Sequence, residues 1–125
     1  MAYTISYTDS ANKGTIVVED LTLNTETSLS IPGRNTTAYG SAIATNFLHL
    51  LENFAFNTQP NNGIEGQLWY DNNTGAETLK VYDGTNWVSA AGIQKAVSAP
   101  DVAASQLGDL WVDTDNQQLY LFESR

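Results

Sequence analysis

The acid-rich tract Asp113-Thr114-Asp115-Asn116 comes nearest to a metal site in this sequence. Calcium loops alternate oxygen ligands in this way, and they also need a glycine in the middle and a bidentate glutamate at the end. Here Gln117 stands at the third ligand position, Gln118 replaces the glycine, and Ser124 replaces the glutamate. A hairpin turn held by local Asp and Asn hydrogen bonds therefore explains the tract better. The same interpretation applies to Asp71-Asn-Asn-Thr-Gly75.

Groups suited to acid–base or nucleophilic catalysis are few. Cysteine is absent, and the single histidine, His49, stands three residues before Glu52, an ordinary spacing for two surface residues of a helix. One imidazole per chain excludes a histidine-based metal site within one subunit. Paired carboxylates for glycoside hydrolysis remain an alternative, because nine acidic residues lie in the segment 58–125, although they occupy turn positions. We therefore expect a protein that is not an enzyme and needs no metal or cofactor.

The aromatic residues are a third group, and they could serve recognition. The three tryptophans and two of the tyrosines stand near Asn and Asp, as in sugar-binding faces: Trp69, Trp87, Trp111, Tyr82 and Tyr120. A small β unit uses the same residue types as its core or as a contact between subunits. Their regular placement in repeated strands favours packing, and recognition of a host surface glycan is the alternative.

The chain of 125 residues is strongly acidic, with 14 Asp and Glu against 5 Lys and Arg and a formal charge of −9. A phosphate backbone or an anionic membrane surface would repel it, so we expect neither nucleic acid nor a membrane as a partner. The longest apolar stretch, Phe47–Leu51, is interrupted by His49, and no run approaches the ~18 residues of a membrane span.

The elements that would position these residues begin with a β segment. Residues Tyr3–Tyr7 alternate apolar and polar, Ser10–Gly14 carries turn residues, and Thr15–Glu19 is β-branched. This pattern predicts two strands joined by a turn. The following segment, Leu21–Ile31, spaces its apolar residues among Thr, Asn and Ser, which predicts an extended arm that ends at Pro32-Gly33.

One segment has the period of a helix. At 100° per residue, five apolar residues fall within about 80° of Phe47 and form a stripe with it: Tyr39, Ile43, Leu50, Leu51 and Phe54. The stripe predicts a helix from about Tyr39 to Ala55, capped by Asn35, Thr36 or Thr37. Gly40 also lies on the stripe, where a close backbone contact would explain it. Because only a thin β segment precedes the helix, we expect the stripe to pack partly against the same stripe in neighbouring subunits.

Beyond the polar linker Asn57–Gly63 the sequence repeats itself with an offset of 42 residues. Gly66-Gln-Leu-Trp-Tyr-Asp71 returns as Gly108-Asp-Leu-Trp-Val-Asp113, and each copy continues into a polar turn and a second strand, Leu79–Tyr82 and Leu119–Phe122. Equal motifs at a fixed offset predict two β-hairpins of one design. Trp69 and Trp111 should then occupy equivalent places, with Tyr82 and Phe122 on the same faces as these tryptophans.

Both faces of each predicted hairpin are apolar, one aliphatic and one aromatic. A lone hairpin of this size cannot bury two faces, so the other repeat, the helix or another subunit must cover one of them. The first copy continues into a third short strand at Trp87-Val88, and the second contains no such segment before Arg125.

These residues resemble a known family. Thr15–Gly40, followed by Asn46–Ala55, looks like the N-terminal region of tail-fibre-like virion proteins of large contractile-tailed bacteriophages. The repeats Gly66–Val88 and Gly108–Phe122 resemble the short hairpin modules strung along those proteins. The resemblance implies a structural role in the virion, in the tail, baseplate or fibre, with other virion proteins as partners. It also implies a homo-oligomer, for which three subunits is the expected number.

The sequence thus predicts a mostly-β α+β protein in three parts. Residues 1–57 form a β segment and one amphipathic helix for anchoring or oligomerisation, 58–91 the first hairpin module, and 92–125 a second, incomplete module. We expect a non-enzymatic virion structural protein, with a carbohydrate-binding adhesin as the alternative. The residues expected at oligomer or packing interfaces are Tyr39, Ile43, Phe47, Leu50, Leu51, Phe54, Trp69, Tyr82, Trp87, Trp111, Tyr120 and Phe122.

Overall fold

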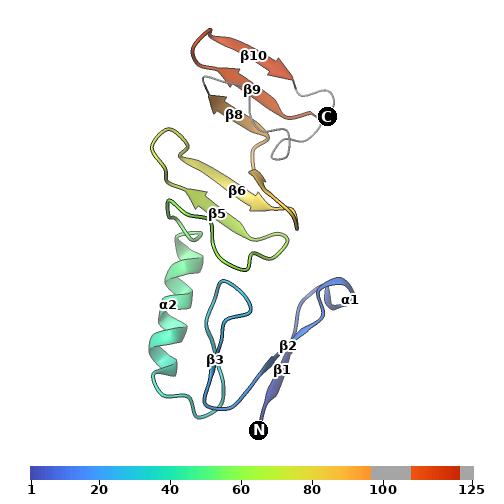
Figure 1. Ribbon diagram of the computed structural model, residues 1–125, viewed down its shortest axis with the longest axis vertical. Coiled ribbons are helices and arrows are strands. Elements are labelled where there is room, and N and C mark those ends of the chain that lie inside the picture. Colours follow the sequence, from blue (N-terminus) through green and yellow to red (C-terminus); the bar gives the residue numbers. More distant parts are fainter. Residues whose placement is uncertain (97–107, 122–125) are drawn as a thin grey trace. The chain divides into compact units, whose positions relative to one another are not determined.

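The computed structural model describes residues 1–96 and 108–121 (Figure 1). Small, mostly antiparallel sheets account for 32% strand against 16% helix, so the expected α+β class is present. The chain divides into two compact units, Met1–Glu52 and Asn53–Arg125. Among the described residues, no helix is both long and apolar enough to cross a bilayer.

The first unit opens with the expected hairpin. Strand β1 (Tyr3–Ser6) pairs antiparallel with β2 (Thr15–Val18), and Tyr3 lies opposite Val18. A single helical turn, α1 (Ser10–Lys13), joins the two strands. In β2, Ile16 and Val18 are buried while Thr15 and Val17 are exposed, so alternate residues of this strand face the core of the unit.

The segment after this hairpin folds back on itself, so the prediction of an extended arm was wrong. Strand β3 (Leu23–Asn24) pairs antiparallel with β4 (Ile31–Pro32). Polar side chains between them bind nearby backbone: the Asn24 Oδ1 accepts from the Glu26 N–H at 2.9 Å. Such local bonds favour turns over extended chain. After β4, the returning chain also needs a glycine at Gly33, because a Cβ at this position would overlap the carbonyl oxygen of Glu19.

Helix α2 (Tyr39–Leu51) is shorter than the predicted span to Ala55. Asn53 and Phe54 have φ angles of 51° and 54°, in the left-handed region, which ends a right-handed helix. The Asn53 carbonyl instead accepts a hydrogen bond from the Tyr70 N–H at 2.9 Å. Phe54 therefore lies outside the helix, and its expected place on the helical stripe was wrong.

The expected capping residues of α2 were also wrong. The residue at the N-cap position is Ala38, with a φ of 60° and no side-chain capping hydrogen bond. Thr36 is occupied elsewhere, because its hydroxyl donates to the Gly33 carbonyl at 2.7 Å. The Thr36 side chain thus bonds to the arm, and none of the three expected residues stands at the N-cap position.

The second unit begins with the first hairpin module. Strands β5 (Leu68–Asp71), β6 (Thr78–Tyr82) and β7 (Trp87–Ser89) form an antiparallel sheet in that order. Trp69 lies opposite Lys80, and Tyr82 lies opposite Trp87. Tyr82 is therefore diagonal to Trp69 on one face, as the alternation predicted.

The second module contains the same hairpin. Strand β9 (Leu110–Asp113) pairs antiparallel with β10 (Gln118–Leu121), and Trp111 lies opposite Tyr120. Both predicted hairpins are present, and Trp111 occupies the place that Trp69 has in the first module. In Figure 1, β9 lies between β10 and a further strand, β8 (Ile93–Ala96), which the sequence analysis did not predict.

The lead strand is a feature that the two modules share. Strand β8 runs parallel to β9, with Ala96 opposite Asp113. In the first module Phe56 bridges in parallel to Asp71, the residue equivalent to Asp113. The repeated unit is thus a parallel lead segment followed by a hairpin, and β7 is an addition on the outer edge of the first hairpin.

Candidate functional site

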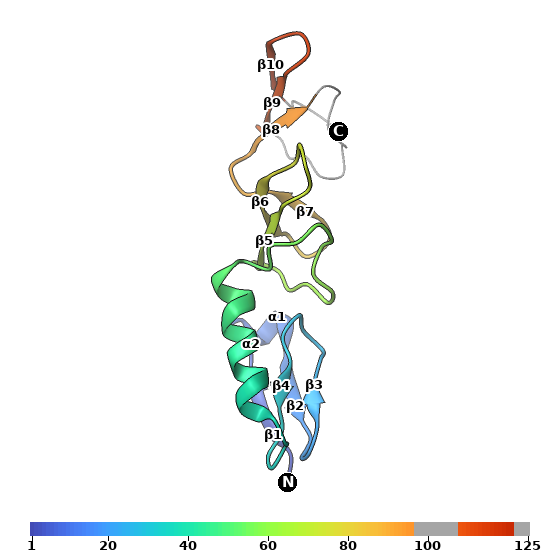
Figure 2. The same ribbon diagram turned by 90° about the vertical axis from the view of Figure 1, so that its left-hand side faces the viewer.

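Helix α2 contacts its own unit through a polar edge, beside β4 (Figure 2). The Asn46 Oδ1 accepts from the Ser30 N–H at 3.0 Å, and the Asn46 Nδ2 donates to the Ser30 carbonyl at 2.7 Å. Ala42 and His49, on the same side of the helix, are half-buried. The amide of Asn46 thus pairs with the chain as a neighbouring strand would, and it fixes the rotation of α2 about its axis.

The apolar stripe of α2 faces away from this contact. We use the name helix stripe for its five exposed members, whose exposed fractions are 63% for Tyr39, 37% for Ile43, 66% for Phe47, 52% for Leu50 and 80% for Leu51. No residue of α2 is buried. Soluble monomers rarely leave large side chains of this kind grouped in water, so the helix stripe is a candidate contact surface.

The spacing along the helix stripe suits contact with another helix. Gly40, Ile43, Phe47 and Leu50 follow at intervals of three, four and three residues, as in the seam of a coiled coil. A Cβ on Gly40 would have no atom within 4 Å. The close backbone contact expected at Gly40 is therefore absent from the described residues of this chain.

Three of the predicted aromatic residues meet in the first module. The rings of Trp69 and Trp87 lie 5.6 Å apart, edge to face, and Tyr82 lies 4.9 Å from Trp87. Both tryptophans are buried. The Lys80 Nζ lies 5.1 Å from the Trp69 ring, in the range of a cation–π contact. Each buried tryptophan packs against protein, which leaves its ring faces unsuited to a sugar.

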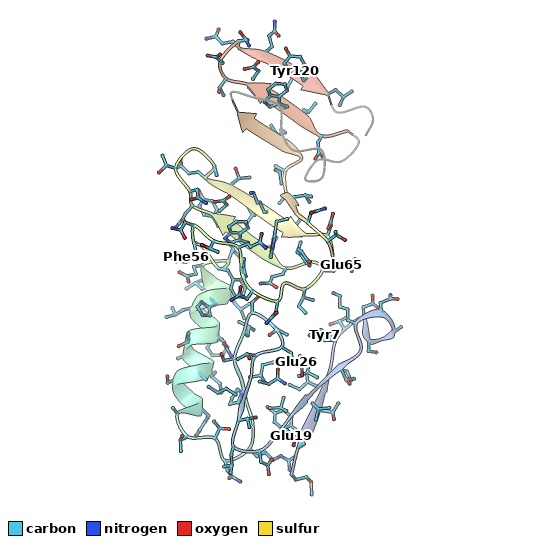
Figure 3. All side chains as sticks on the ribbon, in the orientation of Figure 1. Tyr7, Glu19, Glu26, Phe56, Glu65 and Tyr120 are labelled. Carbon is cyan, nitrogen blue, oxygen red and sulfur yellow. The ribbon has the colours of Figure 1, made fainter. Side chains whose placement is uncertain are left out.

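In the second module the equivalent pair is more open. Trp111 and Tyr120 stack at 4.7 Å with an angle of 22° between the rings. Tyr120, labelled in Figure 3, is 42% exposed, and Trp111 is half-buried. Tyr120 takes the place that Lys80 has in the first module. The predicted contact residue Phe122 lies outside the described residues.

The two acidic tracts form turns, as the hydrogen-bond interpretation expected. The buried Asp71 carboxylate accepts from the Asn73 N–H at 3.0 Å, the Asn73 Nδ2 at 2.8 Å and the Lys80 Nζ at 3.1 Å. The buried Asp113 carboxylate accepts from the N–H groups of Asp115 and Asn116 and from the Asn116 Nδ2. The oxygens that a cation would need are thus engaged by the turns themselves.

These turns also set the charge state of both carboxylates. Burial acts to raise the pKa of Asp71, but the hydrogen bonds from Asn73 and the ion pair with Lys80 outweigh it, so the pKa lies below its ordinary value. For Asp113, hydrogen bonds from the side chain and backbone of Asn116 lower the pKa. Both groups are ionised at neutral pH, and neither has the raised pKa that a catalytic acid needs.

The remaining candidate chemistry is dispersed. The His49 Nδ1 lies 3.7 Å from the Glu52 Oε1, and the two side chains are 41% and 54% exposed, an ordinary i, i+3 pair of a helix. An open cavity of about 510 Å³ in the first unit is lined by Tyr3, residues 32–37 and Tyr39. Its one charged lining residue, Arg34, lies 5.9 Å from the Tyr3 ring. Within 1–96 and 108–121, no three His, Cys, Asp or Glu side chains are grouped to hold a metal ion.

No family model, no curated protein and no solved structure matches this chain. The helix stripe, the aromatic clusters and the sequence patterns are therefore the basis for inferring a function. Sequence reasoning missed two residues that shape these surfaces, Asn46 and Lys80. Each had a signal: Asn46 is a polar residue beside the stripe of a helix, and Lys80 alternates with apolar residues on the tryptophan face of a strand.

Proposed function

We propose that the chain is a non-enzymatic structural protein of a bacteriophage virion, a fibre or fibre-attachment subunit of the tail or baseplate, and that it acts as a homo-oligomer. The observation that supports an oligomer is the exposure of the helix stripe, on a helix whose rotation about its axis is fixed by Asn46. The virion role rests on the resemblance of Thr15–Gly40 and of the hairpin repeats to tail-fibre-like proteins.

Charge supports a second copy of the chain as the partner of the helix stripe. Each chain carries a formal charge of −9, yet no acidic or basic residue lies between Tyr39 and Leu51 except His49 on the other side of the helix. Copies that meet through the helix stripe bury apolar surface without bringing carboxylates together. Each fully buried Phe or Leu would add about 1.5–3 kcal/mol to such a contact.

Gly40 indicates that the partner surface is a closely packed second helix. Its position on the stripe is open to solvent within one chain, and it lies one turn before Ile43. A glycine at this position allows close approach of a second helix, because a backbone can come nearer where no Cβ intervenes.

Replacement of Phe47 by Ala tests the formation of the oligomer independently of the stability of the monomer. Phe47 is exposed in one chain, so the variant monomer should keep its stability within about 0.5 kcal/mol, whereas the oligomer should weaken strongly. A cost of about 3–5 kcal/mol applies only where the ring is fully buried by another subunit. Light scattering gives the mass, with Thr45→Ala on the opposite side of the helix as control. A Phe47→Ala protein with the wild-type mass would contradict the oligomer.

The virion role has its own test. Antibody raised against the chain should label the tail, baseplate or fibres of phage particles that encode it, as seen by immunogold electron microscopy, and the chain should be found in dissociated particles by mass spectrometry. Purified particles without the chain would refute the role. A glycan array tests the adhesin alternative, for which binding that is lost in Tyr120→Ala would be the supporting result.

A further inference from the structure

We propose that the outer edge of β10 is an acceptor for strand addition. It binds, antiparallel to itself, an extended uncharged segment in which an aromatic residue is followed by a β-branched residue. The first module holds such a segment in place, because β7 (Trp87–Ser89) pairs with the equivalent edge of β6. Strand addition at β10 goes beyond the proposed virion role and does not depend on it.

Strand β7 shows how a segment that pairs with this edge contributes to its module. The Ala90 N–H donates to the Leu79 carbonyl at 3.0 Å, so Leu79 and, two residues on, Val81 turn their backbone groups toward β7. Trp87 and Val88 are buried by this pairing. The added strand thus pairs the edge of β6 and also supplies a ring to the aromatic cluster of the module.

In the second module, none of the described strands lies beside the same edge. The Leu110 N–H donates to the Gly92 carbonyl at 2.6 Å, so β9 alternates: Leu110 and Val112 face β8, while Trp111 and Asp113 face β10. Tyr120, opposite Trp111, therefore uses its backbone groups on β9. Leu119 and Leu121 turn theirs outward. In the part of the chain that the structure describes, no strand pairs with this outer edge.

The side chains of β10 are more exposed than their equivalents on β6. Leu119 is 64% exposed against 37% for Leu79, and Leu121 is 56% exposed while its counterpart Val81 is half-buried. An apolar edge strand with unpaired backbone groups is a template for pairing with another segment. Among the described residues, the lower exposure on β6 accompanies its pairing with β7.

The negative charge of the second module indicates which kind of segment can pair with β10. Residues 108–121 include three acidic side chains, Asp109, Asp113 and Asp115, and no basic one. The segment that occupies this edge in the first module, residues 84–90, has no charged side chain. Like charges brought together across an interface would oppose binding, so an acidic segment is excluded and an uncharged aromatic one fits.

The test uses the full chain and a capped peptide with the sequence of residues 84–90, Gly-Thr-Asn-Trp-Val-Ser-Ala, acetylated and amidated. Hydrogen exchange of the Leu119 and Leu121 amides should slow about tenfold or more at saturating peptide, while the Tyr120 amide should change little. A peptide with Ala in place of Trp, or with Asp in place of Ser, should bind about ten times more weakly.

Two variants of the chain complete the design. Leu121→Pro removes an outward N–H but none of the bonds within the hairpin, so it should abolish peptide binding. Leu121→Ala keeps that N–H and should still bind. Unchanged exchange at Leu119 and Leu121, slowed exchange on β6 instead, or equal binding by the two variants would each overturn the proposal.

Discussion

Two aspartates at equivalent positions of the repeat each stabilise a turn, but they do so with different neighbouring residues. Asp71 holds its turn through Asn73 and pairs with Lys80, whereas Asp113 holds its turn through Asp115 and Asn116. The strand position of Lys80 is taken by Tyr120 in the second module. The turn chemistry is therefore repeated, while the side chain that packs on the tryptophan is free to vary.

Asp71→Asn should reduce the acid sensitivity of the fold. The pKa of Asp71 lies below its ordinary value of 3.8, so the ionised group stabilises the fold above about pH 4, and this contribution is lost as the pH falls through the lower pKa of the folded state. Melting temperatures at neutral pH and at about pH 2–3 measure the loss, which should be larger in the wild type than in the variant. Glu77→Gln, an exposed carboxylate in the same turn, is the control. Equal losses in wild type and Asp71→Asn would argue against this role.

Trp87→Ala should destabilise the first module more than Trp111→Ala destabilises the second. Trp87 is 8% exposed and contacts two other rings, so its loss should cost about 3–5 kcal/mol. Trp111 is half-buried and stacks on one ring, so its loss should cost less. Urea unfolding followed by circular dichroism compares the two variants. A larger cost at Trp111 would mean that another segment covers it in solution.

At the scale of elements, the orientation of α2 depends on a polar side chain. The apolar residues of the helix make few contacts within the chain, whereas Asn46 makes two hydrogen bonds with Ser30. This inverts the usual arrangement, in which the apolar stripe of a helix faces its own core. The inversion is the physical reason why the helix stripe is available to another molecule.

Asn46→Ala should loosen α2 from its unit. Loss of two hydrogen bonds at a half-buried site should cost roughly 1–3 kcal/mol, and the amides of Ser30 and its neighbours should exchange faster with solvent. Thermal unfolding and hydrogen exchange measure both effects, and Thr45→Ala, at an exposed neighbouring position, is the control. A variant with wild-type stability and unchanged exchange at Ser30 would show that other contacts hold the helix.

The whole molecule has small cores for its length. Among the described residues, the buried apolar side chains are Ile16 and Val18 in the first unit and Trp69, Trp87 and Val88 in the second. Ten other large apolar side chains among the described residues are more than half exposed. Because burial of apolar surface is the main favourable term in folding, association of several chains is the expected source of further stability.

The assembled protein should tolerate salt. Three chains would carry a formal charge of −27, which is 3 × −9. Added salt screens the repulsion between chains and leaves the apolar contact intact, so the mass from light scattering should stay constant or rise with ionic strength. A complex that dissociates on adding salt would mean that charge pairs hold it together. A stable monomer at micromolar concentration would contradict the oligomer itself.

Local patterns determined much of this fold in advance. Three such patterns each produced the predicted element: the β-branched run from Thr15, the helical period after Tyr39, and the repeat of Gly66–Asp71 at Gly108–Asp113. Each pattern depends on residues that are neighbours in sequence. The turn role of Asp71 and Asp113 was also visible, since Asx turns are closed by residues two or three positions away.

Tertiary contacts decided the rest. The end of α2 depends on the hydrogen bond between Asn53 and Tyr70. The path of the returning arm depends on Gly33, which lies beside Glu19. Strand β8 forms because β9, beginning at Leu110, provides an edge with which it pairs in parallel. Which side of α2 meets its own chain was settled by Asn46 and Ser30, which are 16 residues apart. These choices arise between segments that are distant in sequence, where backbone hydrogen bonds must be satisfied by whichever partner the fold brings near.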